Sequence, residues 1–175
     1  MGLSLAAPAL AASPTPATDR PAVAPPTADH RLDRPPSISA ARIDAVLAEY
    51  GSPAAGLGTT FYDLGLRYGI DPAYPLAFFI VESQAGTQGV ARTTHSIGNI
   101  RCTPGYRCLD GYQAYSSWAA GVEDWYELIR ELYMDQWRLL TPDMILPRYA
   151  PWGDNNDPVK YTASVNQLVD EWCNR

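Results

Sequence analysis

The chain has 175 residues, of which 46% are apolar and 18% charged, and its formal net charge is −6 at pH 7. Such an acidic chain lacks the basic surface that binds nucleic acids and anionic membranes. No apolar run reaches the roughly 20 residues of a membrane-spanning helix. We therefore expect no nucleic-acid partner and no membrane insertion of the mature domain.

The first 36 residues differ in composition from the rest of the chain. Eight of the 16 prolines lie there, and no aromatic residue precedes Tyr50. Residues 1–12 are small and apolar and contain Ala9-Leu10-Ala11, which resembles the end of an export signal, although a basic segment is missing. Residues 13–36 predict a disordered linker, because a Pro/Ala-rich segment buries little apolar surface. We expect residues 37–175 to form one secreted or cell-envelope domain.

The domain predicts a mainly α fold with one short β-hairpin. Apolar periodicity and capping residues predict helices over about 39–50, 60–68, 71–84, 118–134 and 142–149, and a last helix after 157. The third helix is apolar on nearly every face, so we expect it to be central and buried. Residues 97–115 predict the hairpin, with Pro104-Gly105 at its tip.

Two of the three cysteines flank this predicted turn. Cys102 and Cys108 are separated by Thr-Pro-Gly-Tyr-Arg, so a disulfide between them is plausible in an exported protein. Cys173 is then free, unless it pairs with one of the other two. Two alternatives remain open: a zinc site that includes His95 and both hairpin cysteines, or a Cys/His nucleophile pair with His95 as the base.

Glu82 carries the sharpest chemical signal in the sequence. It directly follows the apolar run Phe78-Phe79-Ile80-Val81 at the end of the predicted central helix. Burial in such a setting disfavours the charged form and raises the pKa of a carboxyl group. A carboxylic acid that is protonated near neutral pH can act as a general acid. The alternative is a solvated Glu, or one paired with Arg92 or Arg101.

Three segments around Glu82 resemble the glucosaminidase family, the endo-β-N-acetylglucosaminidase-like domains of bacterial autolysins and flagellar peptidoglycan hydrolases. The segments are Ile80-Val81-Glu82-Ser83-Gln84-Ala85-Gly86-Thr87, Ser96-Ile97-Gly98-Asn99-Ile100-Arg101 and Gly111-Tyr112-Gln113-Ala114-Tyr115-Ser116-Ser117. In that family an apolar helix ends in Glu-Ser, and an Asn-Leu-Phe-Gly-Ile-Lys-like segment and an aromatic-x-x-Tyr-x-Ser stretch follow. The resemblance covers roughly residues 58–172 and rests on the order and spacing of the three motifs.

The resemblance implies a lysozyme-like α+β fold and the hydrolysis of β-1,4 glycosidic bonds in peptidoglycan. Glu82 matches the catalytic acid of the family. The implied substrate-binding residues are Ser83, Gly98, Asn99, Tyr112 and Tyr115. Neither a cofactor nor a metal ion is implied, and we expect a monomer that acts on peptidoglycan or a related glycan containing N-acetylglucosamine.

The second catalytic group is less defined, because the sequence departs from the family here. His95 stands near a family Asn, and the hairpin lacks the Glu that some members carry. Asp110 is the carboxylate available in the hairpin, and Asp154 and Asp157 are alternatives. An inverting enzyme needs a base roughly 6.5–9.5 Å from the acid, whereas a substrate-assisted enzyme uses the N-acetyl group of the sugar.

Aromatic residues at predicted loops and helix ends suggest a sugar-binding groove, with Trp152 as a further candidate binding residue. The group comprises Tyr106, Tyr112, Tyr115, Trp118, Tyr149 and Trp152, whereas Trp125, Tyr126, Trp137, Tyr161 and Trp172 are expected to fill the core. Three alternative functions stay open: a non-catalytic module that binds peptidoglycan or chitooligosaccharides, a lytic transglycosylase, and a Cys/His amidase or peptidase.

Overall fold

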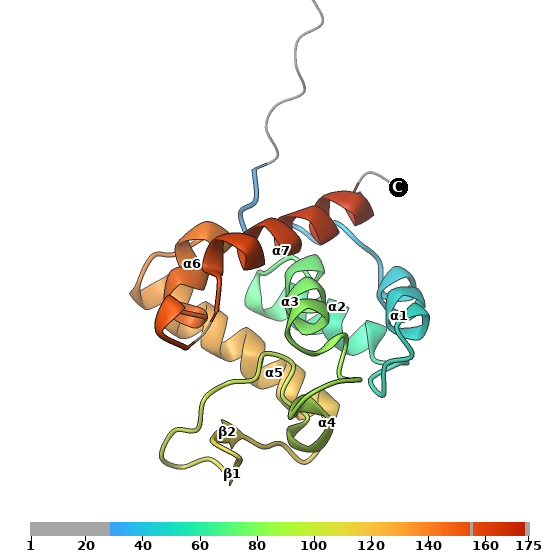
Figure 1. Ribbon diagram of the computed structural model, residues 1–175. Helices are drawn as coiled ribbons and strands as arrows, with labels where there is room; N and C mark the ends of the chain where they lie inside the picture. The colour runs from blue at the N-terminus through green and yellow to red at the C-terminus, as the bar shows by residue number, and fades with distance from the viewer. Residues whose placement is uncertain (1–28, 155, 174–175) are drawn as a thin grey trace, which may run out of the picture.

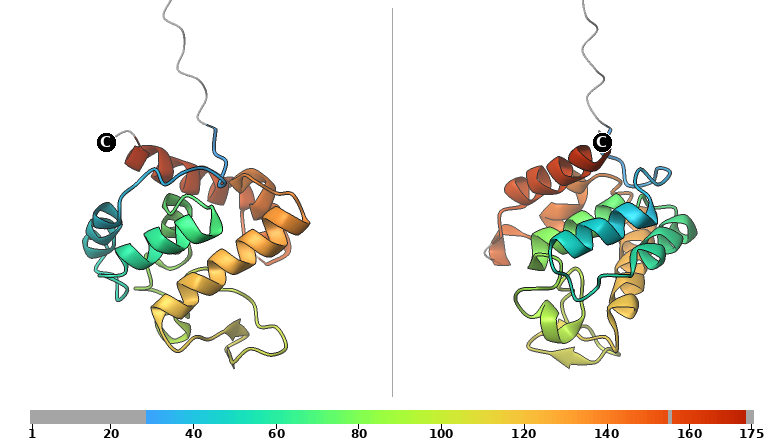
Figure 2. Two further views of the ribbon diagram at one scale, coloured as in Figure 1. Left: turned by 180° about the vertical axis from the view of Figure 1, so that it is seen from behind. Right: turned by 90° about the vertical axis from the view of Figure 1, so that its right-hand side faces the viewer.

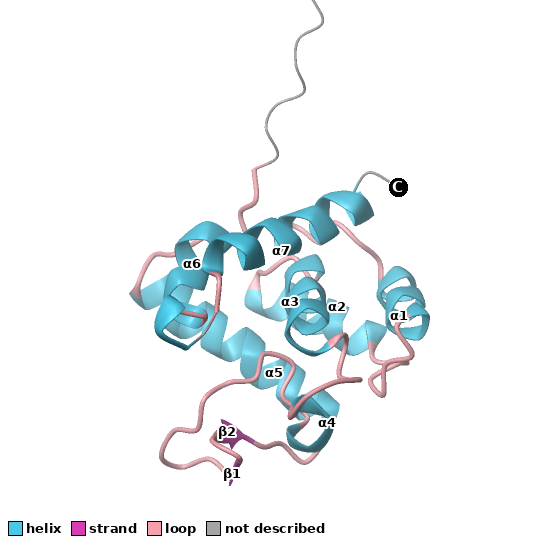
Figure 3. Cartoon of the chain, in the orientation of Figure 1, coloured by secondary structure: helices cyan, strands magenta, loops and turns pink. Residues whose placement is uncertain are grey.

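The computed structural model describes residues 29–154 and 156–173. Within them the fold is mainly helical with one two-stranded antiparallel sheet, which confirms the predicted class (Figures 1 and 3). The predicted export signal and the first part of the linker, residues 1–28, lie outside the described residues. The elements are α1 (Ala40–Glu49), α2 (Gly58–Tyr68), α3 (Ala73–Ser83), α4 (Ala91–Thr94), β1 (Cys108–Leu109), β2 (Tyr112–Gln113), α5 (Trp118–Leu128), the π-helix η1 (Ile129–Gln136), α6 (Pro142–Tyr149), the 3-10 helix η2 (Trp152–Asp154) and α7 (Pro158–Cys173).

Helix α3 is the central element, as its apolar sequence predicts. All its residues from Ala73 to Ile80 are buried, and α7 and α5 pack against it (Figure 1). The Phe78 ring lies 5.1–5.5 Å from the rings of Trp125, Tyr149 and Tyr161. Burying a large apolar side chain contributes about 1.5–3 kcal/mol, so this cluster fixes α5, α6 and α7 around the C-terminal half of α3.

Local side-chain caps explain where three of the helices begin. The Ser39 hydroxyl accepts from the backbone N–H of Arg42 at the start of α1, and Ser117 accepts from Ala120 at the start of α5. The Asp157 carboxylate accepts from the N–H of Lys160 in the first turn of α7. Such caps satisfy N–H groups that have no partner within the helix and contribute about 1 kcal/mol each.

The folded part begins earlier than the sequence suggests. Leu32 is fully buried, donates its N–H to the Leu140 carbonyl and accepts from the N–H of Asp71. Arg34 pairs with the buried Asp71 carboxylate at 2.8 Å. The segment that contains both residues runs beside α7 (Figure 2). The predicted linker therefore ends too late in the chain. Its last residues belong to the folded domain, because the buried Leu32 and the ion pair of Arg34 anchor them.

The hairpin turn also differs from the prediction. Leu109 pairs with Tyr112, so the turn is Asp110-Gly111 rather than Pro104-Gly105. Both turn residues have positive φ, 50° and 84°, as a two-residue type I′ hairpin requires. Pro104 lies in the loop before the paired strands. Proline has no backbone N–H to donate to a neighbouring strand, which favours such a position outside the sheet.

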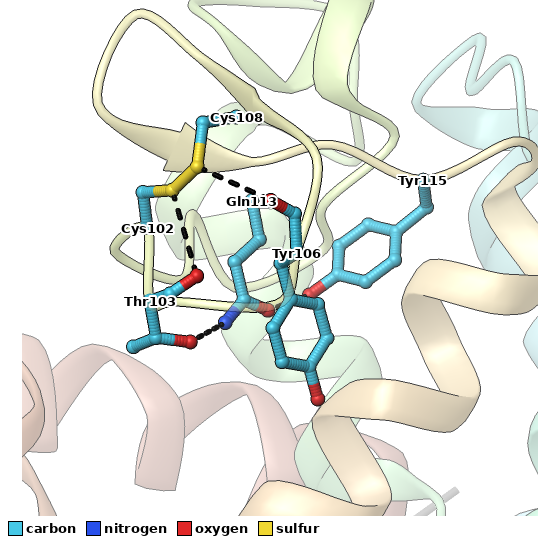
Figure 4. Close-up of a disulfide and its surroundings, with 6 residues drawn as sticks. All are labelled: Cys102, Thr103, Tyr106, Cys108, Gln113 and Tyr115. Carbon is cyan, nitrogen blue, oxygen red and sulfur yellow. Dashed lines mark hydrogen bonds between the residues drawn. A yellow bond between two sulfur atoms is a disulfide. The ribbon is translucent and has the colours of Figure 1, made fainter.

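A disulfide closes the loop before the hairpin. It joins Cys102 and Cys108, as predicted (Figure 4). Cys173 is free and exposed. The Gln113 side chain donates to the Thr103 hydroxyl at 2.9 Å beside the disulfide, which ties the loop to β2. The covalent link thus holds a segment that has little regular structure of its own.

The predicted helix over 118–134 consists of α5 and its continuation η1, whose wider turns carry it to Gln136. Figure 2 shows this helix running diagonally along the length of the domain. Among residues 29–154 and 156–173, no helix has the length and apolarity needed to cross a bilayer.

Candidate active site

Glu82 lies in the last turn of α3 with both carboxyl oxygens occupied. The Tyr161 hydroxyl of α7 donates to Oε1 at 2.6 Å, and Asn99 Nδ2 donates to Oε2 at 3.0 Å. Directly after this turn, Gln84 adopts a left-handed conformation and ends the helix, with its N–H on the Ile80 carbonyl. Three segments far apart in the chain therefore meet at one carboxyl group.

Burial is the main influence on the protonation of this carboxyl. It raises the pKa of Glu82, because the charged form loses solvation, while the donors on Tyr161 and Asn99 lower it by a smaller amount. The net result is a pKa above that of an ordinary glutamate. The Tyr161 pKa is raised well above its usual value by burial and by the adjacent Glu82, so Tyr161 keeps its proton and stays a donor.

The segment that carries Asn99 is held by helix α6. The Tyr149 hydroxyl donates to the Gly98 carbonyl at 2.7 Å. A Cβ atom on Gly98 would clash with that hydroxyl and lie 2.6 Å from Cδ1 of Trp125, so the close approach requires glycine. Asn99 has a φ of 44°, a left-handed conformation that asparagine tolerates better than most residues. Its Oδ1 is buried and has no hydrogen-bond partner among the described residues.

Two adjoining hollows flank Glu82. The larger, which we call the Glu82 cleft, has a volume of about 500 Å³. Its lining residues are Glu82, Gly98, Asn99, Ile100, Arg101, Thr103, Tyr112, Leu128, Tyr133, Arg148, Tyr149, Ala150, Pro151 and Asn156. The smaller, the α7 hollow, measures about 320 Å³ and is lined by Val81, Glu82, Asn156, Asp157, Lys160, Tyr161 and Ser164. Because Glu82 and Asn156 line both hollows, the carboxyl lies between two recesses.

Four of the predicted site residues line the Glu82 cleft. They are Glu82, Gly98, Asn99 and Tyr112. Tyr112 projects from β2, and the Arg101 guanidinium stacks on its ring at 4.9 Å. The cleft therefore combines a carboxyl, an amide and aromatic surfaces, which are the groups that bind and orient sugars.

The other predicted residues lie elsewhere. Ser83 is buried, donates to the Phe79 carbonyl and accepts from the N–H of Gly86, so it belongs to the end of α3. The Tyr115 hydroxyl lies 2.6 Å from the Asp124 carboxylate of α5 and lines neither hollow. Its pKa is raised by burial and by Asp124.

Trp152 and Asp110 are both exposed. Trp152, in η2, is 62% exposed and follows directly after Pro151, which lines the cleft. Asp110 occupies the hairpin turn and lines neither hollow. Of the alternative carboxylates, Asp157 shares the α7 hollow with Glu82.

The geometry gives no support to the thiol and zinc alternatives. Both hairpin sulfurs are bonded to each other, and a disulfide sulfur is not a nucleophilic thiolate. His95 donates from Nδ1 to the Tyr115 carbonyl at 3.0 Å and packs on Trp118. Within the part of the chain that the structure describes, no cluster of three or more His, Cys, Asp or Glu side chains is arranged to hold a metal ion.

Sequence reasoning missed three residues of the site. The periodicity of α7 predicts Tyr161 to fill the core, yet its hydroxyl reaches Glu82 and it lines the α7 hollow. Tyr133 and Arg148 come from the helices after the hairpin and line the Glu82 cleft. One sequence signal could have identified Arg148. It directly precedes Tyr149, a predicted groove residue, at the end of a short helix that Pro151 and Gly153 follow.

Together, the fold and the half-buried carboxyl define a lysozyme-like helical domain. Scans against protein-family models and against curated proteins gave no match. Among solved structures, the chain is similar to autolysin E of S. aureus in complex with the muropeptide NAM-L-Ala-D-iGlu, with 13% sequence identity and a TM-score of 0.56. The match covers 82% of this chain and 70% of the autolysin chain. At this identity the similarity shows a peptidoglycan-hydrolase-like fold.

Proposed function

We propose that the protein is an extracytoplasmic glycoside hydrolase of the glucosaminidase type, which cleaves β-1,4 bonds in peptidoglycan with Glu82 as the general acid. The observation that carries this proposal is the carboxyl of raised pKa between two adjoining hollows. A polymer that extends on both sides of the acid fits such an arrangement. The fold shared with a muropeptide-bound autolysin and the disulfide support the substrate class and the extracytoplasmic location.

The chemistry follows from the contacts of Glu82. In its protonated form the carboxyl donates its proton to the glycosidic oxygen as the bond to the anomeric carbon breaks. The carboxylate that remains is stabilised by the donors from Tyr161 and Asn99, which are already directed at its two oxygens. These preformed donors need no reorganisation when the charge appears, which lowers the barrier.

The group that completes the reaction is a separate proposal. Among the residues whose side chains the structure describes, a set that leaves out Asp154, Glu82 is the one carboxyl group that lines the larger cleft. Asp157 lines the α7 hollow with it and is therefore placed better than Asp110 to activate water, although it also caps α7. The single cleft carboxyl also favours a second candidate function, a lytic transglycosylase, which needs no base for an external water.

The test is mass spectrometry of the products that the full chain releases from purified peptidoglycan. We expect fragments with reducing N-acetylglucosamine ends, and we expect Glu82→Gln to release at least about a hundredfold less. Asp157→Asn tests the base, and Asp110→Asn serves as the exposed control. Anhydro ends would instead identify a transglycosylase.

Two outcomes would overturn the proposal that the protein is a hydrolase with Glu82 as its acid. Full activity of Glu82→Gln would remove Glu82 as the acid. Binding to insoluble peptidoglycan without any released fragment, where a control hydrolase is active, would make the protein a binding module.

A further inference from the structure

The Glu82 cleft contains a cation that the proposed reaction does not use. Arg148 lies in the last turn of α6 and lines the cleft with Glu82. Its guanidinium lies over the Trp137 ring, 4.7 Å from the centroid. Among the residues whose side chains the structure describes, no hydrogen bond or ion pair joins Arg148 to a carboxylate, whereas Arg31, Arg34, Arg42, Arg67 and Arg130 each have one.

The position of this guanidinium is fixed relative to Glu82. Trp137 packs edge-on against Tyr133 at 5.1 Å, and Tyr133 in turn lies 6.0 Å from Tyr149. Tyr149 is bonded to Gly98, next to the asparagine that holds Glu82. A continuous row of rings therefore connects Trp137, on which Arg148 stacks, to the segment that contains Gly98 and Asn99. An arginine stacked through its face keeps its N–H edge free for a planar acceptor.

The charge of the cleft contrasts with that of the whole protein. The chain carries a net charge of −6, but among the side chains that the structure describes, the charged residues that line the cleft are Glu82, Arg101 and Arg148. With Glu82 protonated, as a general acid requires, Arg148 is a cation of the cleft that stacks on an aromatic ring. A neutral N-acetylglucosamine polymer offers no anionic group to this guanidinium, whereas a muramic acid residue carries a carboxylate on its lactyl group or on the stem peptide attached to it.

We propose that Arg148 is a specificity-determining residue that binds a carboxylate on the glycan, so that the Glu82 cleft selects muramyl-containing strands over neutral N-acetylglucosamine polymers. This inference rests on the proposed function and names the substrate class of the same site. The fork of guanidinium donors matches a carboxylate in two parallel hydrogen bonds. Arg148 orients the strand and takes no part in bond cleavage.

The experiment compares kcat and KM of the full chain on strands that differ in carboxylates. Substrates are strands stripped of stem peptides, the same strands with the lactyl carboxylates amidated, peptide-bearing strands and chitooligosaccharides. Variants are Arg148→Gln, Arg148→Lys and the control Arg92→Gln, an exposed arginine in the last turn of α4 that lines neither hollow.

We expect Arg148→Gln to lose roughly tenfold or more in kcat/KM on carboxylated strands, mainly through KM, since a charge-assisted hydrogen bond is lost. Amidated strands and chitooligosaccharides should be unaffected, Arg148→Lys should recover part of the loss, and Arg92→Gln should match the unaltered protein. A loss on stripped strands assigns the lactyl carboxylate, and a loss confined to peptide-bearing strands assigns the stem peptide. An equal loss on charged and neutral strands would overturn the proposal.

A binding measurement separates this proposal from the proposed hydrolysis. Glu82→Gln, alone and combined with Arg148→Gln, is titrated with stripped strands, peptide-bearing strands and chitooligosaccharides in a calorimeter. Binding of a carboxylated strand that falls roughly tenfold with Arg148→Gln, while binding of chitooligosaccharides is unchanged, supports carboxylate recognition even if no variant cleaves peptidoglycan. Equal binding of both stripped and peptide-bearing strands by the two proteins would overturn recognition even if Glu82 proves to be the acid.

Discussion

Replacing Tyr161 with phenylalanine removes one oxygen from the donor pair that holds Glu82. The lost hydrogen bond, 2.6 Å long, lowers the Glu82 pKa in the unaltered protein. Tyr161→Phe should therefore raise that pKa further. In the proposed reaction the protonated acid is the active form, so the decline of kcat/KM at high pH, which reports ionisation of the free enzyme, should move to higher pH. A pH profile on peptidoglycan measures this shift.

The same substitution has a calculable effect on stability. Because its folded-state pKa is raised, Glu82 contributes stability fully below its unfolded pKa, and this is lost as pH rises through the folded pKa. A hydrogen bond contributes about 1 kcal/mol to a neutral acceptor and about 1.5–3 kcal/mol to a charged one. Tyr161→Phe should therefore cost about 1 kcal/mol while Glu82 is protonated and about 2 kcal/mol once it is ionised.

Urea unfolding between pH 4 and 9 checks this dependence, with Tyr126→Phe as the matched control. The buried Tyr126 hydroxyl donates to the neutral Phe61 carbonyl at 2.7 Å, so its loss should cost about 1 kcal/mol at every pH. Two results would refute the coupling between Tyr161 and Glu82. One is a difference in unfolding free energy between the unaltered protein and Tyr161→Phe that stays constant with pH. The other is a pH profile of kcat/KM that does not shift.

Three further predictions concern stability, each measured by urea unfolding. Gly98→Ala should cost about 2–4 kcal/mol through overpacking and a lost hydrogen bond, whereas Gly153→Ala, with open space at its Cβ position, should change little; equal effects would contradict the close-approach argument. Leu32→Ala should lower the free energy of unfolding by about 2–5 kcal/mol. An unchanged free energy would mean that Leu32 is part of the linker and not of the core. Replacing Cys102 and Cys108 by serine should cost about 2 kcal/mol, as a short closed loop predicts; an unchanged midpoint in urea would contradict that value.

The helical plan and the burial of the Glu82 carboxyl could be predicted from the sequence because their signals are local. An uninterrupted apolar run predicts a buried helix, and a carboxyl directly after it is desolvated by the same burial. The three-part resemblance also makes Asn99 a candidate binding residue, and in the structure its side chain contacts Glu82. Ser39 and Asp157 cap helices as their positions before helical segments indicate.

The remaining features depend on contacts that no local pattern encodes. Tyr161 is 79 residues from Glu82, and its periodicity within α7 reads as a core position. Ser83 follows Glu82 in the sequence, but one residue turns a helix by about 100°, so its side chain points inward. The Tyr115 hydroxyl donates a hydrogen bond to Asp124 of α5, away from both hollows. Leu32 is an isolated apolar residue whose burial depends on tertiary packing alone.

The meeting of α3, the Asn99 segment and α7 at one carboxyl joins reactivity to local unfolding. Detachment of α7 removes the Tyr161 donor and opens one wall of the α7 hollow, while the disulfide and the hairpin stay intact. Regions of a protein open with separate free energies, which range from near zero to the global value. The fraction of molecules with an intact Glu82 site therefore depends on the free energy of this local opening as well as on that of global unfolding.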